Sequence, residues 1–330
     1  MNTITDAAPP VLLVHPGTHG VAVYARDTAA EVVRLDDRAR VVTPDAVAAL
    51  TPGTPVHAHV TDRLWGASPE EAAHHVTSLA ARHPLTVTLH DVPQESDGPR
   101  NRPRRAAFYR AVVEAARGVV VNSVHERDLL REEGVWSGAV GVVPLPVVSA
   151  RASRIDEGHD DAVGVLGYFY PGKGHDEALA AAVSAGLTRL TVLGRASDGH
   201  AADLEAFVRR AEGQGVAVEV TGWLDDADMA ARAARVAVPV IAHRHVSASG
   251  SLASWVGWGR CPVAVRNRYV DEMAALRPGT LTVVEAGDLA RAVTAARADS
   301  SSTWHGADPV PFGRTDAARA YVRWWSGVSA

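Results

Sequence analysis

Short apolar runs alternate with longer amphipathic stretches along most of this chain. In its first half, runs rich in Val and Leu predict strands at 11–15, 56–60, 85–90, 118–122 and 140–143. Stretches rich in Ala, Arg and Glu between these runs predict helices near 21–33, 68–82, 104–116 and 124–133. Strands separated by helices are typical of a parallel sheet with right-handed crossovers.

A polar stretch at 149–161 interrupts the alternation and predicts a linker. A second series follows, with strands expected near 163–167, 189–193, 217–221, 236–240, 262–265 and 281–284. Helices are expected near 176–185, 200–213, 226–234, 250–258, 270–276 and 287–297, and a last helix at 315–325. We therefore expect an α/β protein with two Rossmann-like domains, 1–148 and 162–313, whose parallel sheets face a cleft. Ligands of such sheets bind at the carboxyl ends of the strands.

Composition places the chain among globular proteins. It has 330 residues, enough for two domains of ordinary size, and 47% of them are hydrophobic. The net charge of −5 argues against a protein that binds nucleic acid. No window approaches the roughly 18 apolar residues that span a bilayer, and residues 1–10 lack a signal-peptide pattern. The single cysteine, Cys261, excludes an intrachain disulfide, so we expect a cytoplasmic protein.

The run Val163–Leu166, the loop 167–174 and the helix expected after it form a strand-loop-helix unit. Lys173, near the end of the loop, is the only lysine of the chain. Such a loop directs backbone N–H groups and the positive end of a helix dipole to one spot, which favours a phosphate. The spacing is not that of a P-loop, because Gly-His follows the lysine and no earlier glycine is correctly placed.

This loop resembles the one after the first C-terminal-domain strand of family-4-type retaining glycosyltransferases. There the pattern is roughly Gly-Arg-x-x-x-x-Lys-Gly, and its Arg and Lys hold the diphosphate of a nucleotide-sugar donor. Gly167 and Lys173-Gly174 match the pattern, whereas Tyr168 stands where Arg is usual. The resemblance covers residues 11–325 and implies the two-domain GT-B fold. It also implies that the last helix, within 314–330, packs back on the N-terminal domain, anchored by Trp324-Trp325.

Two N-terminal segments carry further resemblance. The loop Pro16–Ala22 resembles the family's Pro-x-x-Gly-Gly loop, which implies that Gly17 and Gly20 approach the donor and that His19 lies on the acceptor side. An ordinary β–α turn is the alternative. The strand end at Thr86–Pro93 resembles the family's Leu-His-Asp-x-Pro element, which implies that His90 reaches the donor sugar and Asp91 lies on the acceptor side. A histidine that merely caps the strand is the alternative.

The region 238–252 lies where the family places its second donor-binding loop. Its serines and Gly250 suit a phosphate at a helix start, although plain N-capping explains them too. The residues implied here are Ser247, Ser249, Gly250 and Ser251. The family's two glutamates are absent, since no acid lies between His243 and Arg266. Arg195 and Arg244 are candidates to replace the diphosphate arginine missing at position 168.

A local basic stretch follows the His90 strand end. It lacks acids from Gly98 to Val113 and holds Arg100, Arg102, Arg104, Arg105 and Arg110. We expect Arg104 and Arg105 on the acceptor side, facing an anionic acceptor or the inner face of an anionic membrane. A solvated, arginine-rich helix is an equally weighted alternative.

Two kinds of metal pattern are present. Asp226-Ala-Asp228 is better explained by helix capping, and the His-x-His pairs at 57–59 and 243–245 lack a third ligand in the sequence. We therefore expect no metal and no resident cofactor.

The resemblance implies a hexosyltransferase that moves a sugar from a nucleotide diphosphate sugar to an acceptor hydroxyl or amine with retention. Lys173 and His90 are the expected catalytic residues. The acceptor is expected to be a small molecule, a glycan or a lipid-linked compound. Two alternatives remain open: a catalytically inactive partner protein of the same fold, and a sugar-nucleotide epimerase.

Overall fold

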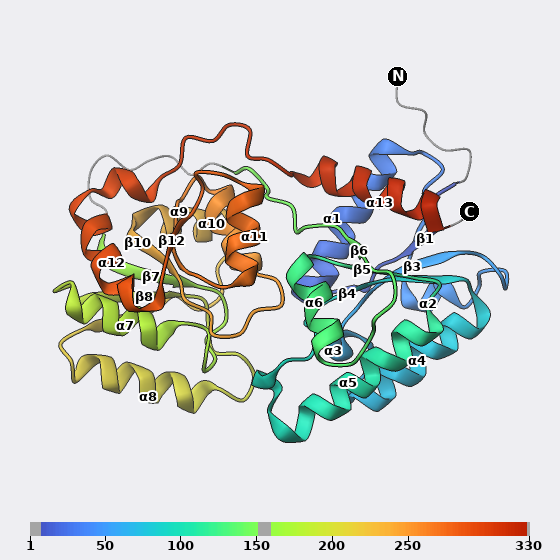
Figure 1. The fold of residues 1–330 in the computed structure, drawn as a ribbon, viewed down its shortest axis with the longest axis horizontal. Coiled ribbons are helices and arrows are strands. Elements are labelled where there is room, and N and C mark those ends of the chain that lie inside the picture. The colour runs from blue at the N-terminus through green and yellow to red at the C-terminus, as the bar shows by residue number, and fades with distance from the viewer. Residues whose placement is uncertain (1–7, 151–159, 329–330) are drawn as a thin grey trace. The chain divides into compact units, whose positions relative to one another are not determined.

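A computed structural model describes residues 8–150 and 160–328 and divides into two compact units (Figure 1). The N-terminal unit comprises the residues up to Pro146 and those from Phe312 onward, and the C-terminal unit comprises Val147–Pro311. Each unit holds one six-stranded parallel sheet, which confirms the expected α/β class. Residues 151–159 of the expected linker lie outside the described residues, and the next strand begins at Asp160.

The sheet of the N-terminal unit has the order β2-β1-β3-β4-β5-β6. Its strands are β1 (Val11–Leu13), β2 (Val41–Val42), β3 (Val56–Val60), β4 (Leu85–Leu89), β5 (Gly118–Val121) and β6 (Gly141–Val142). The helices are α1 (Gly20–Leu35), α2 (Pro44–Val47), α3 (Asp62–Trp65), α4 (Pro69–Arg82), α5 (Gly98–Ala115), α6 (Val124–Glu132) and α13 (Arg314–Val328).

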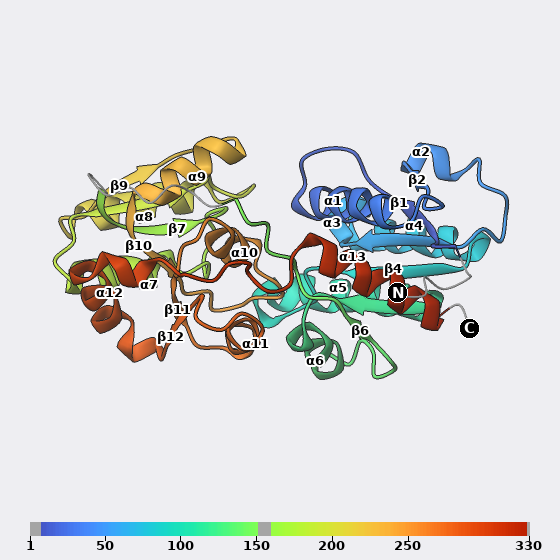
Figure 2. The same ribbon diagram turned by 90° about the horizontal axis from the view of Figure 1, so that it is seen from above.

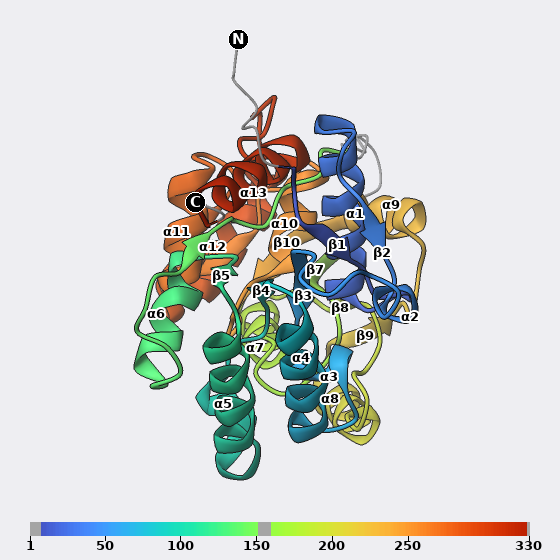
Figure 3. The same ribbon diagram turned by 90° about the vertical axis from the view of Figure 1, so that its right-hand side faces the viewer.

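Alternating residues of β1 divide the apolar core of this unit between the two sheet faces. Val11 and Leu13 belong to the core under α4 and α5, whereas Leu12 packs with residues of α1 and α13. Figure 3 shows these two helix pairs on opposite faces of the sheet. At the end of α13, Trp325 is buried and its indole N–H donates to His57 Nδ1 at 3.2 Å.

The sheet of the C-terminal unit has the order β12-β11-β10-β7-β8-β9. Its strands are β7 (Asp160–Leu166), β8 (Arg189–Leu193), β9 (Ala217–Val220), β10 (Val236–Ile241), β11 (Val263–Val265) and β12 (Thr282–Val284). The helices are α7 (His175–Ser184), α8 (Ala201–Glu212), α9 (Asp226–Arg235), α10 (Gly250–Gly257), α11 (Arg268–Leu276) and α12 (Leu289–Ala298). Helices flank this sheet as well (Figures 1 and 2).

A buried arginine holds the C-terminal unit together where α9 meets β10. Arg260 is 1% exposed, and its guanidinium donates to the carbonyl oxygens of Ala233, Ala234, Val236, Ala237 and Thr303. These carbonyls include orphan acceptors at the end of α9, where a cation also interacts favourably with the helix dipole.

Short elements account for most differences from the expected pattern, and α5 begins at Gly98 rather than near residue 104. Neither β2 nor the one-turn helices α2 and α3 were expected, because two- to four-residue elements show no periodicity. Within the described ranges, none of the helices combines the length and apolarity that crossing a membrane requires.

Candidate functional site

The predicted phosphate loop of the C-terminal unit has a backbone that depends on its glycines. Gly167 follows β7 with φ 109°, and Gly174 is the N-cap of α7 with φ 103°. A Cβ at Gly174 would lie 2.7 Å from the carbonyl carbon of Ala242, just after β10. The loop therefore lies tightly against the end of the neighbouring strand, a fit that only glycine permits there.

Lys173 connects this loop to the second predicted loop. Its Nζ lies 3.3 Å from Ser251 Oγ, which lies 3.0 Å from Ser249 Oγ. Ser249 also caps α10 by accepting from Leu252 N, and Gly250 is the first residue of that helix. The hydroxyl of Ser249 therefore caps the helix while that of Ser251 contacts the lysine, and phosphate binding by these serines stays a prediction.

The ammonium group of Lys173 makes no ion pair among the residues that the structure describes. Burial lowers the pKa of Lys173 to about 8, so the group remains mostly charged at pH 7. The first residue of α7, His175, is buried beside Phe169, and burial lowers its pKa to about 3. The two carboxylates in the first turn of α7, Asp176 and Glu177, are paired with Arg210 and Arg244, so the ammonium group of Lys173 remains for a bound anion at this helix start.

The two arginines proposed to replace the missing one differ in their surroundings. Arg195 follows β8, and its guanidinium stacks over the half-exposed ring of Tyr168 at 5.0 Å. Arg244 instead pairs with Glu177, with Nε 2.6 Å from Oε1. Arg195 also has a carboxylate partner, since its Nη1 lies 3.6 Å from Oδ1 of Asp198, but this ion pair is longer and its carboxylate more exposed than Glu177 beside Arg244. Arg195 is therefore the better candidate for a second phosphate contact. Ser247, also predicted here, is buried at 6% exposure.

The ends of β7, β8 and β9 form a continuous edge that sequence reasoning missed. Gly167, Gly194 and Gly222 follow these strands, and all three have positive φ. Gly194 N donates to Thr221 Oγ1 at 2.9 Å, and Gly222 N donates to Gly194 O at 3.0 Å. Gly167 was predicted from its loop, but Gly194 and Gly222 gave no signal in the sequence, since only the strand order brings the three glycines side by side.

The predicted residues of the β1–α1 loop are exposed in the N-terminal unit. His19 is the N-cap of α1, and its Nδ1 accepts from Val21 N at 3.2 Å. Gly17 has φ 100° and Gly20 begins the helix, each with open space around an added Cβ. The loop is therefore an ordinary capped helix start in this structure, and a role in ligand binding stays a prediction.

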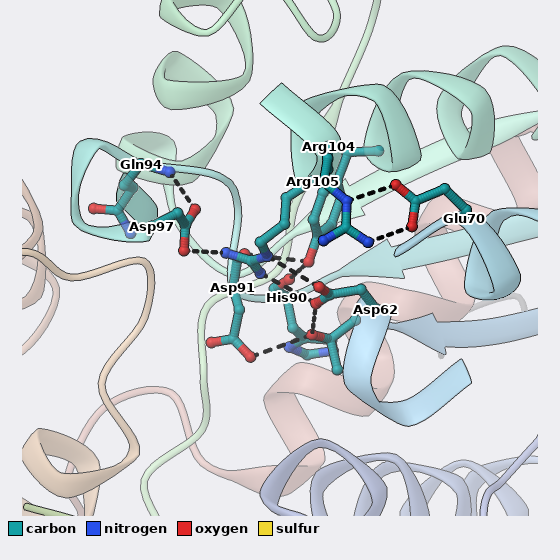
Figure 4. A network of polar contacts seen from close by, with 10 residues as sticks. Asp62, Glu70, His90, Asp91, Gln94, Asp97, Arg104 and Arg105 are labelled. Atoms are coloured by element: carbon teal, nitrogen blue, oxygen red, sulfur yellow. Dashed lines mark hydrogen bonds and ion pairs between the residues drawn. The ribbon is translucent and has the colours of Figure 1, made fainter. Parts of the chain in front are cut away.

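His90 and Asp91 follow β4, as Figure 4 shows. His90 is buried, and its Nε2 lies 3.0 Å from Nδ1 of His59, with which it stacks at 5.2 Å. Burial, together with His59 and His19, holds the pKa of His90 well below its usual value. Asp91 is exposed with φ 52°, and its carbonyl accepts from Arg105 Nη2 at 2.6 Å. His90 is thus a neutral, oriented imidazole, and His59 is a partner that the sequence did not suggest.

The basic stretch is largely paired with acids from other segments (Figure 4). Arg104 forms two hydrogen bonds with Glu70, and Arg105 pairs with Asp62 and Asp97. Arg102 likewise forms two hydrogen bonds with Glu133. The sequence suggested uncompensated positive charge here; the fold supplies carboxylates to these three arginines. Contact with a membrane or an anionic acceptor remains a prediction.

Comparison with known proteins yields similarity in fold alone. No family model and no curated protein matches this sequence. Sucrose-phosphate synthase from Thermosynechococcus elongatus is 14% identical, with a TM-score of 0.67 over 97% of this chain and 96% of that one. Anabaena Alr3699/HepE in complex with UDP and glucose is also 14% identical, with a TM-score of 0.66 over 98% of this chain and 100% of that one.

A third structure extends the same group. The α,α-trehalose-phosphate synthase (UDP-forming) from Burkholderia vietnamiensis is 15% identical, with a TM-score of 0.56 over 95% of this chain and 78% of that one. Two six-stranded parallel sheets with flanking helices match these GT-B glycosyltransferases over nearly the whole chain. This chain therefore has the GT-B fold.

Proposed function

We propose that this chain is a glycosyltransferase that uses a nucleotide diphosphate sugar as donor. The observation that carries the proposal is the contact between Lys173 and Ser251, which joins the loop before α7 to the first turn of α10. Free N–H groups at both helix starts and an unpaired ammonium group suit a diphosphate. Fold neighbours solved with UDP or UDP-glucose support this assignment.

In this proposal, the C-terminal unit binds the donor and the N-terminal unit provides the acceptor side. Lys173 stabilises the negative charge that develops on the departing nucleoside diphosphate. Arg195, exposed beside Tyr168, supplies a second cation for the phosphates. His90 contacts the donor sugar as a neutral imidazole held by His59. The acceptor is a hydroxyl or an amine, and the sugar, a hexose, is transferred with retention.

The resemblance also supplies the path of the proton in this proposal. The departing phosphate oxygen accepts the proton of the acceptor on the same face of the sugar, so no protein base and no metal is needed. Lys173, through its charge, keeps the diphosphate in place during that step. Retention, like this path of the proton, is proposed from the resemblance.

An inactive, nucleotide-binding protein of the same fold is the second candidate. The specific observation that favours it is the composition of the donor loop, where no acid lies between His243 and Arg266. Tyr168, which stands where the family has an arginine, also favours an inactive protein. A serine hydroxyl such as that of Ser247 still forms hydrogen bonds to a sugar, but it does not balance positive charge.

A donor panel distinguishes these candidates. Release of nucleoside diphosphate from UDP- and GDP-linked hexoses is measured with the wild-type protein and with Lys173→Met. The proposal predicts turnover or slow hydrolysis of at least one donor, and its loss in the variant. Nucleotide binding without release of product from any donor would favour the inactive protein, and the absence of both would refute the nucleotide-sugar assignment.

A further inference from the structure

A cavity in the N-terminal unit is lined by residues to which no role has been assigned so far. Its volume is about 280 Å³, close to the lower end of the range for small-molecule sites. Residues of α2 and α4 line it from two helices, and Leu13 of β1 and His15, just after that strand, complete the lining. A cavity of this size suits a compact ligand.

Much of the cavity wall is apolar. Leu79 of α4, Val47 of α2 and Trp65 at the end of α3 contribute to it. The ring of His15 packs edge-on against Trp65, with ring centroids 4.7 Å apart. Burial, together with His19, lowers the pKa of His15 to about 4, so this imidazole is uncharged at neutral pH. These side chains therefore suit the apolar body of a ligand.

The lining changes in character along α4. His75 lines the cavity beside Trp65, since its Nδ1 lies 2.7 Å from Trp65 O. Arg82 lines it about two helical turns further along α4, a distance of about 10 Å. A ligand that lies along this face of α4 therefore has an aromatic wall at one end and a guanidinium group at the other.

The guanidinium group of Arg82 has no acidic partner among the residues that the structure describes. It is exposed, and its Nη2 donates to Ala48 O, just after α2, at 3.3 Å. Over the described ranges, no aspartate or glutamate lines the cavity, although the whole chain has a net charge of −5. The planar fork of an arginine matches a carboxylate, which accepts two parallel hydrogen bonds from it. The charge of this end therefore favours an anionic ligand group.

We propose that this cavity binds a small carboxylate with a compact apolar body. The carboxylate pairs with Arg82, and the apolar body lies between α2 and α4 and reaches Trp65. The inference does not rest on the proposed function, because it uses residues of the N-terminal unit alone. It adds to this chain a ligand class that contains neither a nucleotide nor a sugar.

NMR titration of the ¹⁵N-labelled full chain with 3-phenylpropionate tests this, and 3-phenylpropanamide serves as the uncharged probe of the same shape. The proteins are the wild type, Arg82→Gln, Ser78→Phe and Arg26→Gln. Ser78 is exposed and lines the cavity from α4, so a phenyl group there fills the site without replacing a buried side chain.

Arg26→Gln is the matched control. Like Arg82, Arg26 is exposed, donates to a backbone carbonyl at 3.3 Å, here that of Gly17, and forms no ion pair with a described residue. It belongs to α1, which covers the opposite face of the sheet from α4.

We expect 3-phenylpropionate to bind the wild type with a Kd of about 1 mM or below and to shift the signals of α2, α4 and the Trp65 indole. Because Arg82 is exposed, its replacement by glutamine is expected to weaken binding by only about 3- to 10-fold, and the amide probe binds more weakly by a similar factor. Ser78→Phe abolishes saturable binding, and Arg26→Gln leaves it unchanged.

Four outcomes would overturn the inference. The first is the absence of saturable shifts at these residues up to about 10 mM probe. The second is equal affinity for the acid and the amide, and the third is an equal effect of Arg82→Gln and Arg26→Gln. The fourth is a shift of the same signals with protein concentration in the absence of probe, which would assign the cavity to a second copy of this chain.

Discussion

The buried histidines of the N-terminal unit predict that the C-terminal helix loses stability in acid. The indole N–H of Trp325 can only donate, so His57 Nδ1, at 3.2 Å, is the acceptor. In the neutral ring, Nε2 then carries the proton and donates to Thr88 Oγ1 at 3.1 Å. Thr88 Oγ1 lies 3.0 Å from the hydroxyl of Tyr321 in α13. A charged His57 still donates from Nε2, but its Nδ1 no longer accepts, so the hydrogen bond from Trp325 of α13 depends on an uncharged His57.

The magnitude follows from the pKa of this group. Burial, together with His90, lowers the pKa of His57 from its model-compound value of 6.5 to about 3. The unfolded chain therefore binds a proton at a higher pH than the folded one. The contribution of His57 to stability is complete above pH 6.5 and is lost as the pH falls toward 3. At pH 4.5 the loss is about 2.7 kcal/mol, from about 1.4 kcal/mol per pH unit.

Hydrogen–deuterium exchange measures this effect for α13 directly. The free energy of opening of residues 314–328, corrected for intrinsic exchange, is compared between pH 7.5 and pH 4.5 in the wild type and in His57→Gln. We expect a loss of at least about 2 kcal/mol in the wild type, because His59 and His90 are buried and neutral too. The variant is less stable at pH 7.5 but has a shallower pH dependence. Equal slopes in the two proteins would refute this reasoning.

Three further predictions concern the C-terminal unit. Arg260→Leu leaves five carbonyl oxygens without their donor and is expected to destabilise the unit by about 3 kcal/mol or more, measured by urea denaturation. Gly174→Ala is expected to lower the free energy of unfolding by about 1–3 kcal/mol and to weaken nucleotide binding. Gly172 also has a positive φ, of 88°, but has open space around an added Cβ, so Gly172→Ala is expected to lower the free energy of unfolding by only about 1 kcal/mol. Equal losses of the two variants in thermal denaturation would contradict the steric argument. Since the pKa of Lys173 is about 8, nucleotide affinity in calorimetry is expected to fall up to tenfold per unit above pH 8; a constant affinity up to pH 10 would contradict a charged lysine in the site.

Much of the fold follows from periodicity in the sequence. The expected strand near 236–240 is β10 (Val236–Ile241), and the expected helix near 250–258 is α10 (Gly250–Gly257). Longer elements such as these carry enough residues for an apolar pattern to be recognised. The two-residue strand β2 (Val41–Val42) is too short for such a pattern, and it is defined by its pairing with β1 at the edge of the sheet.

Only part of the candidate site could be predicted from the sequence. Lys173 is exceptional in the sequence itself, so its loop could be identified without a structure. The ion pairs of Arg102 with Glu133 and of Arg104 with Glu70 could not be predicted from the sequence, because the partners lie 31 and 34 residues apart and meet only in the folded chain. The cavity beside Trp65 was not predicted either, since its lining comes from segments that meet only in the folded chain.

The central claim is that Lys173 holds the diphosphate of a nucleotide donor, and calorimetric titration of UDP and GDP into the wild type and Lys173→Met tests it most directly. Arg244→Met is the matched control, because Glu177 already neutralises that arginine. We predict that Lys173→Met weakens the nucleotide that binds by about 10- to 150-fold, the scale of a charged hydrogen bond, and that Arg244→Met changes its affinity less than about threefold. Equal affinities of the wild type and Lys173→Met, or a loss in the Arg244 variant as large as that in the Lys173 variant, would contradict the account.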